Sequence, residues 1–295
     1  MERLWSRENL GIATFPLMEE GLEGFLVFAA SLGLNYVEIR SERPYAFPQD
    51  IGKKETERIG EKLTSFSLEP IIHTAVYDIN LASLNPLIRK ASIRQTVESI
   101  KFAAKIGAKI VIIHPGRLPK DYPPMYMKNS RINLLTSLNV MARMAGRMGV
   151  MLAIENSPRG TAHRLVATPQ EHLYILKRLG SPHLGALLDL GHAYTWGLDL
   201  RQYIRFMAEY ILLFHLHDNR GGADEHLPLG KGNVDLKGIM GEIQRLTKHH
   251  PLILNMRRRE DIEESIKFLE KMGKGRGLGR LLGKKGVPIT EVGGS

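Results

Sequence analysis

The chain contains no cysteine among its 295 residues. This absence excludes disulfide bonds, thiolate metal ligands and cysteine nucleophiles. The sequence also has no uninterrupted apolar run near the ~18 residues that a membrane-spanning helix needs. Its first residues, MERLWSREN, lack the apolar stretch of an export signal. We therefore expect a protein that is not embedded in a membrane and that resides in the cytoplasm.

Motifs of several common enzyme classes are absent as well. The chain has no G-x-S-x-G turn and no G-x-G-x-x-G after an early strand, which disfavours a serine hydrolase and a dinucleotide-binding fold. The segment GRLLGKKG resembles a phosphate-binding P-loop. It lacks the required spacing, the Ser or Thr after Lys and a preceding strand, so we discard it.

Acidic residues are outnumbered, and the formal net charge is +10. A basic surface attracts phosphate backbones. Much of the excess lies in residues 271–286, KMGKGRGLGRLLGKKG, which hold six Lys or Arg and six Gly without an acidic residue. We expect one domain over residues 1–270 and a flexible basic tail over 271–295, which is either simply solvated or an arm that contacts phosphate or an acidic partner.

Short runs rich in Val, Ile and Leu recur along the chain without alternation, as expected for parallel strands buried on both faces. Eight such runs are present: LGIAT (10–14), YVEIRS (36–41), PIIHTA (70–75), KIVIIHPG (109–116), VMLAIEN (150–156), LGALLDLGH (184–192), ILLFHLHD (211–218) and LILNM (252–256).

Helical patterns separate these runs. Apolar residues at three- and four-residue spacing predict helices at 21–33, 91–107, 131–149, 168–180 and 259–273, and Thr168 with Glu171 forms a capping-box signature. Alternating β and α units imply a parallel sheet, and eight units most simply close into an α/β (β/α)8 TIM barrel of one domain. A doubly wound open sheet is the alternative.

Metal-ligand residue types stand at the ends of most of these runs. They are His73, His114, Glu155, Asp189 with His192, and His215 with His217. In a closed barrel the strand ends meet at one mouth. A single histidine there is more often a hydrogen-bonded structural group, but the convergence of so many favours a divalent metal. Imidazole and carboxylate are the ligands that zinc, manganese, cobalt and iron take when no thiolate is available.

Further residues extend this set. Asp224 and His226 lie in the loop DNRGGADEHLPLGKG and are spaced so that both can face one ion. His217 and Asp218 are candidates for a role behind the ligands or toward substrate. Glu38 is a candidate for either a salt bridge with Arg40 or Arg43 or a substrate contact. The other histidines, His163, His172, His183, His249 and His250, are expected at the surface.

The segments IIHTAVYDINLAS, VIIHPG, LAIEN, LLDLGHAYTWGLDL and FHLHDNRGGADEHLPLGKG together resemble the xylose isomerase-like barrel superfamily, which holds endonuclease IV and sugar isomerases and epimerases. The likeness spans about residues 10–270. It implies His73, His114 and a bridging Glu155 around one ion. A second ion would lie among Asp189, His215 and Glu155, and a third among His192, Asp224 and His226.

One position departs from the family's pattern. Where the family has a strand-eight glutamate, this chain has Asn255, whose amide offers a carbonyl oxygen but neither a charge nor a base. Sugar epimerases rely on that glutamate as ligand and acid/base, so its loss should impair their proton transfer directly. Hydrolysis by a metal-bound hydroxide needs no such base and better survives the change. Asn255, His217 and Glu38 remain candidates for weak ligands or substrate contacts.

Three functions stay open at this point. The first is an endonuclease IV-like hydrolase of phosphodiester or phosphate-bearing substrates, with Glu155, Asp189 and His215 at its catalytic centre and one to three ions, zinc first, with manganese, magnesium or cobalt as alternatives. Its partner would be damaged DNA or a small phosphate-bearing molecule. The second is a sugar or sugar-phosphate isomerase or epimerase with a single metal. The third is a metal-binding barrel that lost catalysis with the strand-eight carboxylate.

Overall fold

The computed structural model describes residues 7–15, 20–160, 162–246 and 249–274. Eight parallel strands form a closed barrel in the order β1-β10-β9-β8-β6-β4-β3-β2. They are β1 (Leu10–Ala13), β2 (Tyr36–Ser41), β3 (Glu69–Thr74), β4 (Ile110–Ile113), β6 (Met151–Glu155), β8 (Leu184–Asp189), β9 (Ile211–Leu216) and β10 (Leu252–Leu254). The predicted (β/α)8 barrel is therefore confirmed, and the open-sheet alternative is wrong.

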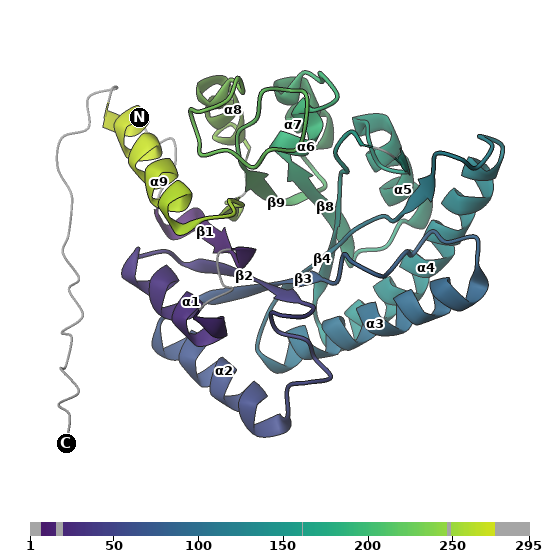
Figure 1. The fold of residues 1–295 in the computed structure, drawn as a ribbon, viewed down its shortest axis with the longest axis horizontal. Coiled ribbons are helices and arrows are strands. Elements are labelled where there is room, and N and C mark those ends of the chain that lie inside the picture. Colours follow the sequence, from purple (N-terminus) through teal and green to yellow (C-terminus); the bar gives the residue numbers. More distant parts are fainter. Residues whose placement is uncertain (1–6, 16–19, 161, 247–248, 275–295) are drawn as a thin grey trace.

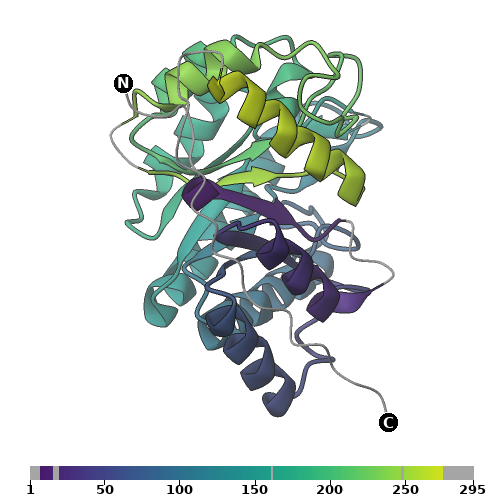
Figure 2. The same ribbon diagram turned by 90° about the vertical axis from the view of Figure 1, so that its left-hand side faces the viewer.

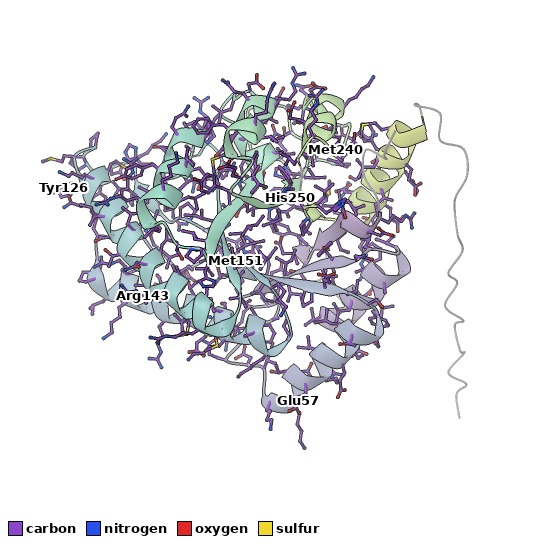
Figure 3. All side chains as sticks on the ribbon, turned by 180° about the vertical axis from the view of Figure 1, so that it is seen from behind. Glu57, Tyr126, Arg143, Met151, Met240 and His250 are labelled. Carbon is purple, nitrogen blue, oxygen red and sulfur yellow. The ribbon has the colours of Figure 1, made fainter. Side chains whose placement is uncertain are left out.

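Helices surround the strands (Figure 1). They are α1 (Gly21–Ser31), α2 (Lys53–Ser65), α3 (Pro86–Lys105), α4 (Tyr126–Met148), α5 (Pro169–Leu179), α6 (Leu190–Tyr194), α7 (Leu200–Met207), α8 (Leu236–Ile243) and α9 (Arg259–Lys274). Figure 3 shows Glu57 and Tyr126, from α2 and α4, at the periphery, whereas Met151 at the start of β6 lies near the centre. Among the described helices, none combines the length and apolar character needed to cross a membrane.

The two ends of the chain close the barrel together. Strand β1 pairs in parallel with both β2 and β10. Figure 2 shows β1 and α9, which come from opposite ends of the sequence, side by side. Two ion pairs join these regions, Arg7 with Glu270 at 2.7 Å and Arg259 with Glu20 at 2.7 Å. Because both pairs are partly exposed, each contributes little, and the strand pairing carries the closure.

The barrel interior explains where the polar side chains lie. A compact apolar cluster fills it, formed by Ala13, Ile71, Ile112, Ala153, Leu187, Leu213 and Ile253. Side chains two residues apart on a strand face the same side. His73, Glu155 and His215 each follow a member of this cluster by two residues. They therefore point toward the barrel axis at its carboxyl-terminal mouth.

Helix boundaries follow local capping chemistry. Thr168 and Glu171 form the predicted capping box at the start of α5. Helix α3 begins at Pro86, five residues before the start that the apolar pattern predicted. Two features explain the earlier start: the Asn85 side chain accepts a hydrogen bond from the Leu87 amide, and proline is favoured in the first turn of a helix. Helix α9 runs to Lys274, so residues 271–274 of the predicted tail belong to this helix, whereas the rest of that tail, 275–295, lies outside the described residues.

The surface assignment of two histidines is wrong, since His172 and His250 are 0% and 5% exposed. His172 occupies the inward face of α5 with Ile175 and Leu176. Its Nε2 lies 2.9 Å from the carbonyl oxygen of Ile154, and its Nδ1 lies 3.1 Å from the hydroxyl of Tyr203. A neutral ring that donates through Nε2 and accepts through Nδ1 satisfies both contacts.

We expect this buried ring to make the protein acid-sensitive. Burial lowers the pKa of His172 to about 4, against the opposing pull of the Ile154 carbonyl. Below pH ~6.5 His172 binds a proton in the unfolded chain but stays neutral in the folded chain. The free energy of unfolding therefore falls as pH drops from about 6.5 to about 4. The contribution is up to about 3 kcal/mol. Chemical denaturation at several pH values should show a shallower pH dependence for His172→Gln than for the parent, whereas His183→Gln should keep the parent slope.

Candidate metal centre

Three groups of imidazole and carboxylate side chains converge at the carboxyl-terminal mouth of the barrel. The first is His73, His114 and Glu155, the second is Glu155, Asp189 and His215, and the third is His192, His217, Asp224 and His226. Within each group the potential ligand atoms lie within 4.8 Å of one another. A four-coordinate zinc ion with bonds of about 2.0–2.2 Å spaces its ligand atoms roughly 3.5 Å apart, so each group is close to the size of a single-ion site. Each group therefore has the size and donor chemistry to hold one divalent cation.

Glu155, at the end of β6, belongs to two groups. Its Oε2 lies 2.7 Å from Nε2 of His114 and 3.6 Å from Nε2 of His73. Its Oε1 lies 3.4 Å from Nδ1 of His215. The residue is buried, and Oε2 has no hydrogen-bond partner among the described residues. One carboxylate oxygen thus faces each group, which is the arrangement of a bridging ligand.

Backbone carbonyls fix the tautomers of three rings. Nδ1 of His73 lies 2.8 Å from the carbonyl oxygen of Thr74, and Nδ1 of His192 lies 2.8 Å from that of Asn156. Nδ1 of His226 likewise lies 2.7 Å from the carbonyl oxygen of Asn255. A carbonyl only accepts, so in each ring Nδ1 carries a proton, and Nε2 is the atom that can bind a cation once it is deprotonated. The Nε2 lone pairs are then free to bind a cation, as in metal sites whose histidines are oriented from behind.

His215 is held the opposite way round. Its Nε2 donates to Oε2 of Glu38 at 2.6 Å, while its Nδ1 lies 3.4 Å from Oδ2 of Asp189. Glu38 is buried and contacts neither Arg40 nor Arg43 in an ion pair; those arginines pair with Glu42 and Asp50. The salt-bridge interpretation of Glu38 is therefore wrong. The carboxylate instead orients the His215 ring, because a buried imidazole N–H needs an acceptor.

The third group collects His192 from α6 and three residues from the segment that follows β9. Oδ2 of Asp224 lies 3.3 Å from Nε2 of His192 and 3.2 Å from Nε2 of His226. His217, which is fully buried, lies 3.0 Å from Oδ1 of Asp189 and 3.7 Å from Oδ1 of Asp224 through its Nε2. Oδ1 of Asp224 has no hydrogen-bond partner in the described part of the chain. The structure thus adds His217 to this group as a fourth donor.

Protonated histidines offset part of the carboxylate charge of the cluster. Burial alone would raise the pKa of Glu155 and of Asp189, but the surrounding histidines hold both pKa values well below their usual range. Burial lowers the pKa of His192, yet the carboxylates of Asp189 and Asp224 raise it to about 10. Glu38 likewise raises the pKa of His215 against its burial. Protonated rings therefore supply part of the positive charge that a cation would otherwise supply, so protons and metal compete for this cluster.

Asn255 lies at the edge of the second group. Its Nδ2 is 3.1 Å from Nδ1 of His215, and its Oδ1 is buried without a hydrogen-bond partner in the described structure. A half-turn of the amide exchanges these two atoms and turns the oxygen toward the group. The position can therefore offer a neutral oxygen ligand but no negative charge.

Two further residues hold the ligands or their loop in place: Asn156, to which the sequence assigned no such role, and Asp218, for which a role behind the ligands or toward substrate was expected. Asn156 donates from Nδ2 to the carbonyl oxygen of Asp189 at 2.9 Å and accepts from the amide of Asp189 at 2.8 Å. Asp218 accepts from the backbone amides of Gly230 and Val234 and so shapes the loop after β9. For Asn156 the sequence offered a signal, because it directly follows Glu155.

Comparison with known proteins agrees with the barrel fold. The family model described as xylose isomerase-like TIM barrel matches residues 26–272. An uncharacterised protein of Methanocaldococcus jannaschii is 27% identical over 243 residues, which cover 81% of this chain and 80% of that protein. A probable endonuclease 4 of Campylobacter concisus is 25% identical over 281 residues, which cover 86% of this chain and 95% of that protein. The crystal structure of a D-tagatose 3-epimerase-like protein superposes with a TM-score of 0.81 at 24% identity and covers 90% and 96% of the two chains, a likeness of fold.

Proposed function

The chain belongs to the xylose isomerase-like TIM barrel family, and from this premise we propose that it is a divalent-metal-dependent hydrolase of phosphodiester or phosphate-bearing substrates. The observation that carries the proposal is the number of ligand groups. The described residues contain three such groups, two of which share Glu155. A one-metal isomerase needs one group, whereas clusters of several ions serve hydrolysis by clamping the attacking and leaving oxygens of a phosphoryl centre.

The residues of the chain would have distinct tasks in this reaction. One cation would be held by His73, His114 and Glu155, and a second by Glu155, Asp189 and His215. A third would be held by the third ligand group. Zinc is the first choice of metal for these donors. When bound, such ions activate water and neutralise phosphate charge. Glu38 and Asn156 would keep His215 and Asp189 aimed at their cation. The name of the Campylobacter concisus relative, probable endonuclease 4, favours DNA as the substrate.

Asn255 favours hydrolysis over epimerisation. Epimerisation next to a carbonyl needs an acid and a base on opposite faces of the substrate. Glu155 is available for one of these tasks, but Asn255 cannot take a proton at neutral pH. The second candidate, a sugar or sugar-phosphate isomerase or epimerase, is supported by the group Glu155, Asp189 and His215, which by itself has the donors to hold a single ion.

Cleavage of a DNA duplex that carries one abasic site would test the leading proposal. We expect strand cleavage by protein purified without chelator, loss of cleavage after chelation, and recovery on addition of zinc, manganese or cobalt. Elemental mass spectrometry should find two or three ions per chain. Absence of cleavage with every one of these metals would contradict the nuclease, and solvent deuterium entering a ketose or aldose would establish the isomerase instead.

A further inference from the structure

Two arginines face one another beside the metal centre. Strands β5 (Arg117–Pro119) and β7 (Ala162–Arg164) form a small antiparallel sheet outside the barrel, and Arg117 stands directly opposite Arg164. Directly opposed residues of an antiparallel pair project to the same face. The neighbouring residue Leu118 is buried, so the other face of this sheet packs on the protein. The two guanidinium groups therefore share the open face.

This arrangement is unfavourable unless an anion accompanies it. Like charges directly opposite one another destabilise a strand pair. Among the residues that the structure describes, no carboxylate forms an ion pair with Arg117 or Arg164. Nε of Arg164 is buried and has no hydrogen-bond partner within the described part of the chain. Burial and the charge of Arg117 lower the pKa of Arg164, with Asp224 opposing them. A buried guanidinium donor without an acceptor is a rare and costly feature.

The backbone of Arg117 is held in place by a separate loop. Oδ1 of Asn80 accepts from the amide of Arg117 at 3.1 Å, and Nδ2 of Asn80 donates to its carbonyl oxygen at 2.7 Å. The preceding Gly116 has φ of 80°, and a Cβ there would lie 2.4 Å from Oδ1 of Asn80. The close approach thus requires glycine. Such a clamp fixes the position from which the Arg117 side chain extends, which limits the entropy lost when it binds a ligand.

Both arginines line one pocket together with a residue of the first ligand group. The pocket lining includes His114, Gly116, Arg117, Ser157 and Arg164. Nε2 of His114 is the atom that lies 2.7 Å from Glu155. An anion in this pocket would therefore sit beside the first metal position and within the influence of both guanidinium groups.

We propose that Arg117 and Arg164 form an anion subsite that binds a phosphate group of the substrate other than the one being cleaved. A guanidinium fork matches phosphate oxygens in pairs, so two arginines can bind a flanking phosphodiester, which carries one negative charge, or a terminal phosphate, which carries close to two. The subsite rests on the proposed hydrolase and narrows its substrate class to molecules with a flanking or terminal phosphate, such as a nucleic-acid strand or a sugar phosphate.

Calorimetric titration with inorganic phosphate tests the subsite without relying on turnover. Parent, Arg164→Ala, Arg117→Ala and the control Arg147→Ala, an exposed arginine of α4, would be compared at equal metal content, checked by elemental mass spectrometry. We expect phosphate affinity to fall about 10- to 100-fold in each subsite variant, because each loses charged hydrogen bonds, and to stay unchanged in the control. Acetate should bind much more weakly than phosphate. Equal phosphate affinity in Arg147→Ala and in both subsite variants would overturn the proposal.

Kinetics then separates the subsite from the function on which it rests. Bis(4-nitrophenyl) phosphate has a single phosphate, whereas an abasic-site duplex has flanking ones. We expect Arg164→Ala to lower kcat/KM about 10- to 100-fold on the duplex and to leave the single-phosphate diester within about twofold. An equal loss on both substrates would overturn the subsite but not the hydrolase. If neither diester is cleaved, the hydrolase fails, and the phosphate titration still decides the subsite, with ribose 5-phosphate as the sugar-phosphate probe.

Discussion

Replacing Glu155 with Gln should nearly abolish metal-dependent activity and remove metal from two positions at once. Glutamine keeps the size of the side chain but loses the negative charge, and its amide nitrogen cannot bind a cation. Because Oε1 and Oε2 face different ligand groups, one substitution weakens both. Loss of residues that only orient ligands typically costs 10- to 100-fold in affinity, so loss of a shared ligand should cost more, roughly 10³-fold or beyond in kcat/KM.

The matched control for this substitution is Glu242→Gln. Glu242 is also buried, but it lies on α8 and pairs with Arg205 and Arg245. Elemental analysis should show fewer ions per chain in Glu155→Gln and unchanged content in Glu242→Gln. A Glu155→Gln protein that keeps the parent's metal content would mean that this carboxylate does not bridge two ions.

The barrel could be predicted from the sequence because its signals are local. Each strand is a short run of Val, Ile and Leu, and the alternation of such runs with helical patterns has few topological solutions. The polar residues at the strand ends then face the mouth by the two-residue period of a strand. His73, Glu155 and His215 illustrate this, since each stands two residues after an apolar residue of the barrel interior.

The features that escaped prediction depend on contacts between distant segments. Strands β5 and β7 have three residues each, too few for a periodic pattern, so the pairing of Arg117 with Arg164 left no mark in the sequence. For Glu38 the sequence leaves a salt bridge with Arg40 or Arg43 and a substrate contact as alternatives, whereas its partner in the structure, His215, is 177 residues away. His172 was placed at the surface because a single polar residue on a helix normally is exposed; its two buried partners come from β6 and α7.

Asn255→Glu should convert the second ligand group into a stronger metal site and make the protein more dependent on metal. The new carboxylate would join Glu155, Asp189 and Glu38 in a buried region, where uncompensated like charges are costly. Without metal we expect the free energy of unfolding to fall by about 3 kcal/mol. With a divalent ion the extra charge becomes favourable, so affinity should rise about 10-fold or more, since added ligand charge tightens binding.

The same substitution distinguishes a working hydrolase from a barrel without catalysis. If the parent is a hydrolase, Asn255→Glu should change its rate on phosphodiesters only modestly, because the proposed reaction uses no base at this position. Thermal unfolding with and without chelator should meanwhile show a wider gap in Tm than in the parent, while Asn255→Gln, the uncharged control of equal size, should show the parent's gap. An activity that is absent in the parent and appears only in Asn255→Glu would mean that the natural chain binds metal without catalysis, and that the missing carboxylate alone accounts for the loss.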